Sequence, residues 1–185
     1  MDITHFNKRA WNKQVEKNNV WTQPVSPSII AQAKDGQFSI LLTPEKPVPR
    51  EWFPDLNGSK VLALASAGGQ QGPILAASGA DVTVFDNSPA QLAQDKFVAD
   101  REGLKLRLIE GDMQDLSRFK DGEFDFIFHP CSNCFVPQIK TVWQHCFRIL
   151  KSKGTMVVGF VNPIVYLPDP ELEKKGVVTL KYKMP

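Results

Sequence analysis

From residue 61 onward, short apolar runs alternate along the chain with longer segments of mixed polarity. Five runs have the length and the aliphatic, β-branched or aromatic content of buried strands: VLALA (61–65), DVTVFD (81–86), KLRLIEG (105–111), FDFIFHP (124–130) and TMVVGFV (155–161). The segments between them predict helices over 70–79, 88–102 and 139–150. Ser88 and Pro89 suit the N-cap and the first position of the second helix. This alternation predicts an α/β fold, a Rossmann-like, doubly wound and mostly parallel sheet with helices on both faces.

Residues 1–57 have a different pattern. They are polar, contain three of the four tryptophans and are interrupted by prolines. The stretch RAWNKQVEK around Trp11 is compatible with a helix, and Trp21 is followed by the proline-broken TQPVSP. We predict a helical, aromatic extension over 1–57 and a main domain over 58–185. The two tryptophans either cover a site as a lid or pack the extension itself.

The end of the chain offers one further strand candidate, VVTLKYK (177–183), and no hairpin partner for it. We therefore expect the sheet to be incomplete at its C-terminal edge. Because an unpaired strand edge is a template for pairing with another chain, the expected state is a monomer or a homodimer through this edge.

Composition narrows the class of protein. The 185 residues carry a net charge of +2, which shows no excess that would indicate a nucleic acid or an anionic membrane as partner. The N-terminus has no apolar signal region, and no run approaches the roughly 20 apolar residues of a membrane span. Three cysteines are too few and odd in number for a disulfide framework. We expect a cytoplasmic protein whose partners are small molecules.

Small and polar residues gather where the predicted strands end, which is where ligands bind in open parallel sheets. They are Ala65, Ser66, Ala67, Gly68, Gly69 and Gln71 after the first strand, Asp86, Asn87 and Ser88 after the second, Gly111, Asp112 and the adjacent Met113 after the third, and His129, Ser132 and Asn133 at or after the fourth. Asp86 follows Gly69 at close to the spacing of about 20 residues at which such folds place an acid on a ribose hydroxyl. An adenosine-containing ligand is therefore expected.

The glycine turn ASAGGQQG distinguishes between adenosine ligands. It lacks the GxGxxG pattern of nicotinamide and flavin enzymes, and it has no lysine for a phosphate-binding Walker loop. What it offers is a turn of small residues before a helix, whose free N–H groups suit one carboxylate. S-adenosylmethionine, which has a carboxylate, a ribose and an adenine, fits this pattern.

Over residues 61–160 the sequence resembles the class I S-adenosylmethionine-dependent methyltransferases. The stretches ASAGGQQGPILAASGADVTVFDNSPAQLAQD and FIFHPCSNCFVP are similar to a small prokaryotic subgroup of undefined substrate. The resemblance implies that Asp86 binds the ribose and that Asp112, with Met113 beside it, lies on the adenine side.

The sequence departs from the superfamily pattern at two places. The superfamily's strand-1 acid falls on Ala63, and its first two glycines fall on Ala65 and Ala67, while Gly69 keeps the third. After the fifth strand the chain is shorter than the superfamily's usual end, so the resemblance implies a C-terminally shortened member.

The function expected from these observations is methyl transfer from S-adenosylmethionine to an unidentified small molecule. Trp11, Trp21, Asn133 and Phe135 are the residues expected on the substrate and lid side. One alternative is a catalytically inactive remnant that binds S-adenosylmethionine or a partner. Another is an NAD-dependent oxidoreductase, which shares the fold.

Two further motifs have alternative interpretations. His129 at a strand end is a candidate general base and a candidate cofactor contact, or simply a histidine hydrogen-bonded within its loop. Cys131 and Cys134 form a C-x-x-C pair, which elsewhere indicates redox chemistry or half of a zinc site. Because the pair follows the fourth strand and does not open a helix after the first, we interpret it as part of a loop and expect no metal.

Overall fold

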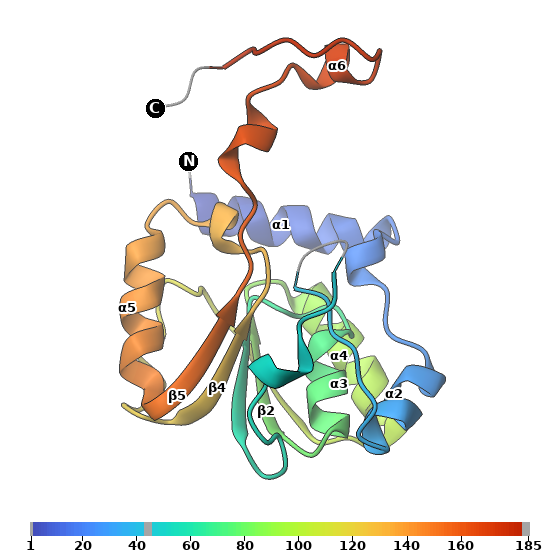
Figure 1. Cartoon of the computed structure of the whole chain (residues 1–185), viewed down its shortest axis with the longest axis vertical. Helices are drawn as coiled ribbons and strands as arrows, with labels where there is room; N and C mark the ends of the chain where they lie inside the picture. Colours follow the sequence, from blue (N-terminus) through green and yellow to red (C-terminus); the bar gives the residue numbers. More distant parts are fainter. Residues whose placement is uncertain (1, 43–45, 183–185) are drawn as a thin grey trace.

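The computed structural model describes residues 2–42 and 46–182. Its centre is a five-stranded parallel sheet (Figure 1). The strands are β1 (Lys60–Leu64), β2 (Asp81–Asp86), β3 (Leu106–Glu110), β4 (Phe124–His129) and β5 (Leu150–Val158). Their spatial order is β3-β2-β1-β4-β5, so the chain winds outward in both directions from β1, as expected for a doubly wound Rossmann-like sheet.

Helices cover both faces of the sheet. On one side lie α2 (Pro27–Lys34), α3 (Gln71–Ala77) and α4 (Pro89–Glu102), and on the other lies α5 (Ile139–Ile149) (Figure 1). Helix α4 begins as its sequence predicts, because the hydroxyl of Ser88 accepts a hydrogen bond from the backbone N–H of Gln91 at 3.2 Å. Helix α1 (Ile3–Glu16) crosses the end of the sheet where the strands terminate. The sequence pattern therefore predicted the order of elements from residue 60 to residue 158 correctly.

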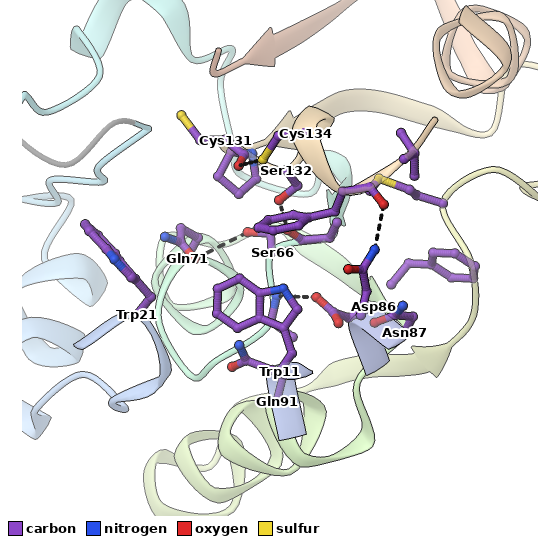
Figure 2. Close-up of a pocket in the computed structure, with 18 of the residues that line it drawn as sticks. Trp11, Trp21, Ser66, Gln71, Asp86, Asn87, Gln91, Cys131, Ser132 and Cys134 are labelled. Atoms are coloured by element: carbon purple, nitrogen blue, oxygen red, sulfur yellow. Dashed lines mark hydrogen bonds between the residues drawn. The ribbon is translucent and has the colours of Figure 1, made fainter. Parts of the chain in front are cut away.

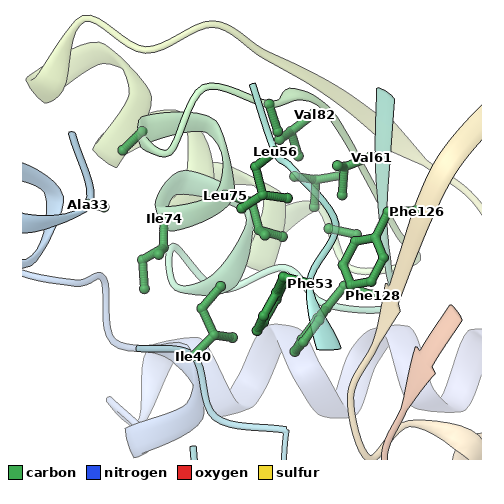
Figure 3. Close-up of a cluster of buried hydrophobic side chains, with 14 of the residues drawn as sticks. Ala33, Ile40, Phe53, Leu56, Val61, Ile74, Leu75, Val82, Phe126 and Phe128 are labelled. Atoms are coloured by element: carbon green, nitrogen blue, oxygen red, sulfur yellow. The ribbon is translucent and has the colours of Figure 1, made fainter. Parts of the chain in front are cut away.

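The hydrophobic core has two parts, one on each face of the sheet. The first, drawn in Figure 3, packs Val61 and Phe126 of the strands against Leu75 of α3. Phe53 and Ile40, from the segment before β1, belong to this same part. Helix α1, by contrast, contains no buried residue. Within residues 1–57, the part after α1 thus contributes to the main core, whereas α1 lies on the surface.

Two predicted strands are corrected. The fifth strand was expected over 155–161, but β5 covers Leu150–Val158 and begins directly after α5. A β-bulge between β4 and β5 accommodates the early start, and Gly154 lies in it, where an added Cβ would be 2.9 Å from the backbone oxygen of Lys151.

The edge strand predicted over 177–183 is also wrong within the described residues. Up to residue 182 this segment shows only an isolated bridge from Leu180 to Pro168, and residue 183 lies outside the described part. The short helix α6 (Pro170–Glu173) precedes it, and the whole segment extends away from the sheet (Figure 1). Val178 and Leu180 are 74% and 70% exposed, so their apolar character reflects no packing against the sheet.

Candidate functional site

A cavity of about 320 Å³ lies at the carboxyl ends of the strands, beneath α1. That volume is at the lower end of the range of about 300–1,000 Å³ typical of small-molecule sites. Of the residues expected to bind a cofactor, those that line it are Ala65, Ser66, Ala67, Gln71, Asp86, Asn87, Gly111, Asp112 and Met113. Of those expected on the substrate side, Trp11, Trp21 and Phe135 line it. Figure 2 shows Trp11 of α1 lying near Asp86 and Asn87 at the end of β2, with Ser66 of the loop after β1 close by.

The loop after β1 forms one wall of the cavity. Ala65 has a positive φ of 47°, a conformation that costs a residue with a side chain about 1–2 kcal/mol. Its N–H donates to the backbone oxygen of Phe85 at 2.8 Å, and its own carbonyl accepts from the hydroxyl of Ser132 at 2.8 Å. These bonds hold a strained backbone between β2 and the loop after β4, which is a common arrangement at binding sites.

Asp86 ends β2 and faces the cavity (Figure 2). One carboxylate oxygen accepts from the N–H of Ser88 at 2.9 Å, and the other accepts from the N–H of Ala67 at 3.3 Å. Burial raises the pKa of Asp86 to about 6, although these backbone hydrogen bonds favour the ionised form and oppose the rise. At neutral pH the carboxylate is therefore ionised and able to accept hydrogen bonds from a ligand's hydroxyl groups.

Asp112 lies in the loop after β3 and connects it to α1. Its Oδ2 accepts from the hydroxyl of Thr4 at 2.7 Å and from the side-chain amide of Gln114 at 3.2 Å. The backbone oxygen of Thr4 in turn accepts from the side chain of Asn87 at 3.2 Å. The first turn of α1 is thus bound to the ends of both β2 and β3.

Further contacts hold α1 over the cavity. The side chain of Asn7 donates to the backbone oxygen of Phe135 at 2.7 Å, and Lys8 forms an ion pair with Glu110. The indole of Trp11 meets the ring of Phe135 edge to face, with centroids 5.5 Å apart. Although α1 has no fully buried residue, Ala10 and Val15 are partly buried and the helix packs against α4, so these polar contacts and the aromatic pair add to a shallow apolar contact.

Four predicted cofactor residues do not line the cavity, and Ser88, Gly68 and Gly69 are the three that belong to the loops after β1 and β2. Ser88 is buried as the N-cap of α4. Gly68 and Gly69 face the protein: a Cβ on Gly68 would lie 2.8 Å from the backbone oxygen of Trp21, and one on Gly69 would lie 2.9 Å from the backbone oxygen of Gln94. Both glycines have positive φ angles. The backbone conformation of these glycines, and their packing against neighbouring backbone, each require glycine at these positions.

His129 and Asn133 also lie outside the cavity lining. His129 is fully buried; its Nδ1 is 2.9 Å from the backbone oxygen of Leu64, and its Nε2 is 3.0 Å from the side-chain oxygen of Asn133. The amide of Asn133 donates to the backbone oxygen of Gly159 at 3.0 Å. Burial lowers the pKa of His129. With both ring nitrogens engaged, this histidine connects β1, the loop after β4 and, through Asn133, the end of β5.

The two cysteines of the C-x-x-C pair both line the cavity. The thiol of Cys131 donates to the backbone oxygen of Leu42 at 3.4 Å, and burial raises its pKa. Among the described residues no group of three or more His, Cys, Asp or Glu side chains is arranged to hold a metal ion.

Several residues at the site were not expected from the sequence. Thr4, Asn7 and Gln91 line the cavity, as do Leu41 and Leu42 from the segment before β1. No local pattern distinguishes the residues other than Gln91, because they reach the site through the tertiary packing of α1 and of the proline-rich segment. Gln91 was detectable in principle, since it lies three residues after the N-cap, in the first turn of the helix that follows Asp86.

The open parallel sheet has a cavity at its switch point and an acid at the end of β2, an arrangement that class I methyltransferases share with dinucleotide-binding enzymes. Residues 62–158 match the family described as Methyltransferase domain, and the chain belongs to this family. It is similar to the uncharacterized methyltransferase YbaJ of Bacillus subtilis, with 52% identity over 183 residues that cover 99% of this chain and 72% of the relative. The chain is thus an S-adenosylmethionine-dependent methyltransferase of unassigned substrate.

Solved structures support the fold. One is a methyltransferase from Mesorhizobium loti, described as dependent on S-adenosylmethionine. It superposes with a TM-score of 0.57 at 20% identity, and the match covers 64% of this chain and 54% of the Mesorhizobium loti chain. A putative enzyme of the same description from Methanococcus maripaludis has a TM-score of 0.56 at 16% identity, and the match covers 86% of this chain and 65% of the Methanococcus maripaludis chain.

Among the described residues, no helix has both the length and the apolar character needed to cross a membrane.

Proposed function

We propose that this chain binds S-adenosylmethionine in the cavity at the end of the sheet and transfers its methyl group to a small molecule. The observation that carries the proposal is the position of Asp86. Its carboxylate lines the cavity at the end of β2 and lies against the wall formed by residues 65–67. The family match supports the cofactor, and this carboxylate gives the cofactor's ribose a place to bind.

The residues present fit such a cofactor. Asp86 would accept hydrogen bonds from the ribose hydroxyls. Asp112 and Met113 lie at the end of the neighbouring strand and would contact the adenine side, with Asn87 between the two acids in the lining. Ala65, Ser66 and Ala67 have side chains small enough for the backbone of the turn to approach the ligand closely.

The acceptor would occupy the aromatic and aliphatic part of the cavity. Trp11, Trp21 and Phe135 line it, together with Leu41 and Val136. Within the described residues the lining contains no lysine, arginine or histidine. An acceptor with a strong negative charge would find no counter-ion there, so we infer an acceptor that is neutral or nearly so at the part that enters the cavity.

Methyl transfer places modest demands on the protein. The bound cofactor supplies a methyl group on a sulfonium, whose departing sulfur is a good leaving group. The chain's residues would orient the two reactants and exclude water, and α1 with Trp11 covers the cavity for that purpose. His129, which we considered as a base, is buried outside the lining with both ring nitrogens engaged, so we assign it a structural role.

Calorimetry tests the proposal directly. The chain is titrated with S-adenosylhomocysteine, S-adenosylmethionine and NAD. We expect stoichiometric binding of the first two and none of NAD, followed by formation of S-adenosylhomocysteine when a panel of neutral thiols, amines and phenols is supplied. Binding of NAD with no binding of S-adenosylhomocysteine would reject the proposal in favour of an oxidoreductase. Binding without turnover on any acceptor would favour a cofactor-binding remnant.

A further inference from the structure

Asp95 lies on the inner face of α4, two turns after the N-cap, and is completely buried. Its Oδ2 accepts a hydrogen bond from the backbone N–H of Gly68 at 2.8 Å. Its Oδ1 has no hydrogen-bond partner among the described residues. A buried carboxylate with one oxygen unsatisfied is costly, which indicates that the position has a purpose other than packing.

The glycine turn and the start of α3 pack closely against this carboxylate and its neighbours. An added Cβ on Gly72 would lie 3.2 Å from Oδ1 of Asp95 and 2.7 Å from a methyl group of Val84. An added Cβ on Gly68 would lie 2.8 Å from the side-chain oxygen of Gln91. The turn therefore lies directly against α4, and Asp95 contacts it from outside the cavity lining.

Two carboxylates hold consecutive amides of the turn. Asp86 accepts from the N–H of Ala67 at 3.3 Å, and Asp95 accepts from the N–H of Gly68 at 2.8 Å. Asp86 lines the cavity, whereas Asp95 does not. β1 itself supplies no acid, because residues 61–67 are all apolar or small. Asp95 is thus the buried acid that binds the turn from α4.

We propose that Asp95 is a positioning residue for the cofactor, whose ionised carboxylate holds the Gly68 amide and so keeps residues 65–67 in the conformation that forms the cavity wall. This inference rests on the proposed function, because it assumes that the wall contacts S-adenosylmethionine. It assigns Asp95 no contact with either reactant.

The electrostatic surroundings make this contact sensitive to pH. Burial raises the pKa of Asp95 to about 7, and the negative charge of Asp86 adds to the rise, while the amides of Gly68 and Gly69 oppose it. The glycine turn (65–70), α3 and the turn Val20–Thr22 contain no ionisable side chain. Asp86, at the end of β2, is the charged group whose proximity raises the pKa of Asp95. As pH falls through neutrality Asp95 gains a proton, and its hydrogen bond to Gly68 loses the assistance of the charge.

Cofactor affinity should therefore depend on pH near neutrality, where Asp95 titrates and where the titration of Asp86, centred slightly lower, overlaps it. We expect the affinity for S-adenosylhomocysteine to rise about tenfold between about pH 6 and pH 8, following the ionised fraction of a group with a pKa near 7. Asp95→Asn keeps an oxygen that can accept from Gly68 but cannot titrate. At about pH 8 this variant should bind S-adenosylhomocysteine several-fold more weakly than wild type does. Its affinity should lose most of the pH dependence and keep only the smaller change that comes from the titration of Asp86 near pH 6.

The experiment is calorimetry with S-adenosylhomocysteine across this pH range on wild type, Asp95→Asn and the control Asp100→Asn. Asp100 is an exposed acid on the same helix, paired with Lys96. A second measurement needs no ligand: the amide resonance of Gly68 is followed by NMR. It should titrate near neutrality in wild type and in the control, and should not titrate in Asp95→Asn.

The outcomes separate the two proposals. If wild type binds S-adenosylhomocysteine and Asp95→Asn shows the same affinity and pH profile, Asp95 has no positioning role and the inference is wrong. A Gly68 resonance that titrates equally in wild type and Asp95→Asn would also overturn it. If wild type binds no S-adenosylhomocysteine at any pH, the proposed function fails first, whatever the Gly68 resonance does.

Discussion

The hydroxyl of Thr4 donates a 2.7 Å hydrogen bond to Oδ2 of Asp112 and thereby joins the first turn of α1 to the loop after β3. Residues 108 positions apart are brought together at the point where a cofactor's adenine side is expected. Asp112, which would contact the cofactor, also holds α1, the helix that covers the cavity. If Asp112 contacts the cofactor as proposed, access to the cavity and occupancy of the cavity are coupled through this residue.

The first prediction concerns this coupling. Thr4→Val removes the hydroxyl and preserves the shape of the side chain, so α1 should open more often. We expect the dissociation rate of S-adenosylhomocysteine to rise up to about tenfold, since a hydrogen bond to a charged group contributes about 1.5 kcal/mol or more. Surface plasmon resonance measures the rate. His5→Ala, which changes an exposed neighbour on the same helix, is the control and should leave it unchanged. An unaltered rate in Thr4→Val would mean that α1 does not control access.

The second prediction tests the ribose contact. Asp86→Ala should weaken binding of S-adenosylhomocysteine by about 1.5–3 kcal/mol, because charge-assisted hydrogen bonds are lost. Asp81→Ala is a matched control, since Asp81 is an exposed acid at the opposite end of the same strand. Calorimetry on both variants, with circular dichroism to verify folding, gives the comparison. Equal affinities for the two variants would show that Asp86 does not bind the ribose.

The sequence predicted the strands and helices between residues 60 and 158 because the central strands β1, β2 and β4 are short, mostly apolar and mostly buried. In DVTVFD, for example, four of the six residues are buried. The same reasoning failed at 177–182, where apolar residues lie exposed on a segment that leaves the sheet. Local composition cannot distinguish a run that packs on a sheet from one that has no surface to pack on.

At the site, the acids at the ends of the strands could be predicted from the sequence. The contacts that residues of α1 and α4 make with the loops at these strand ends could not. Asp86 and Asp112 follow strands, so topology alone brings them to one edge. Thr4 and Asp95 reach the site from helices, through packing that no short motif encodes. Asp95 looks like an ordinary polar position of a surface helix, yet it is completely buried.

A third prediction follows from the packing around Gly69. Gly69→Ala should destabilise the fold, because the new methyl group would lie 2.9 Å from the backbone oxygen of Gln94 in addition to occupying a positive φ of 74°. Gly103→Ala is the control: its φ is 66°, but nothing lies within 4 Å of the added Cβ. We expect about 1–2 kcal/mol for Gly103→Ala and about 1–3 kcal/mol more for Gly69→Ala. Urea unfolding measures both free energies. Equal losses would show that the collision is relieved at little cost.

The last prediction concerns Cys131 and Cys134. Both line the cavity, but the thiol of Cys131 is hydrogen-bonded to the backbone of Leu42, and burial raises its pKa, so it is poorly suited to act as a thiolate ligand or nucleophile. The double variant Cys131→Ser, Cys134→Ser should therefore keep its affinity for S-adenosylhomocysteine within about twofold, a change of less than 0.5 kcal/mol. Elemental analysis of the purified wild-type protein should find no stoichiometric zinc, and mild oxidation should leave cofactor affinity unchanged. Stoichiometric zinc that is lost in the double variant, or an affinity controlled by a disulfide between the two thiols, would instead assign the pair a metal or redox role at the cavity wall.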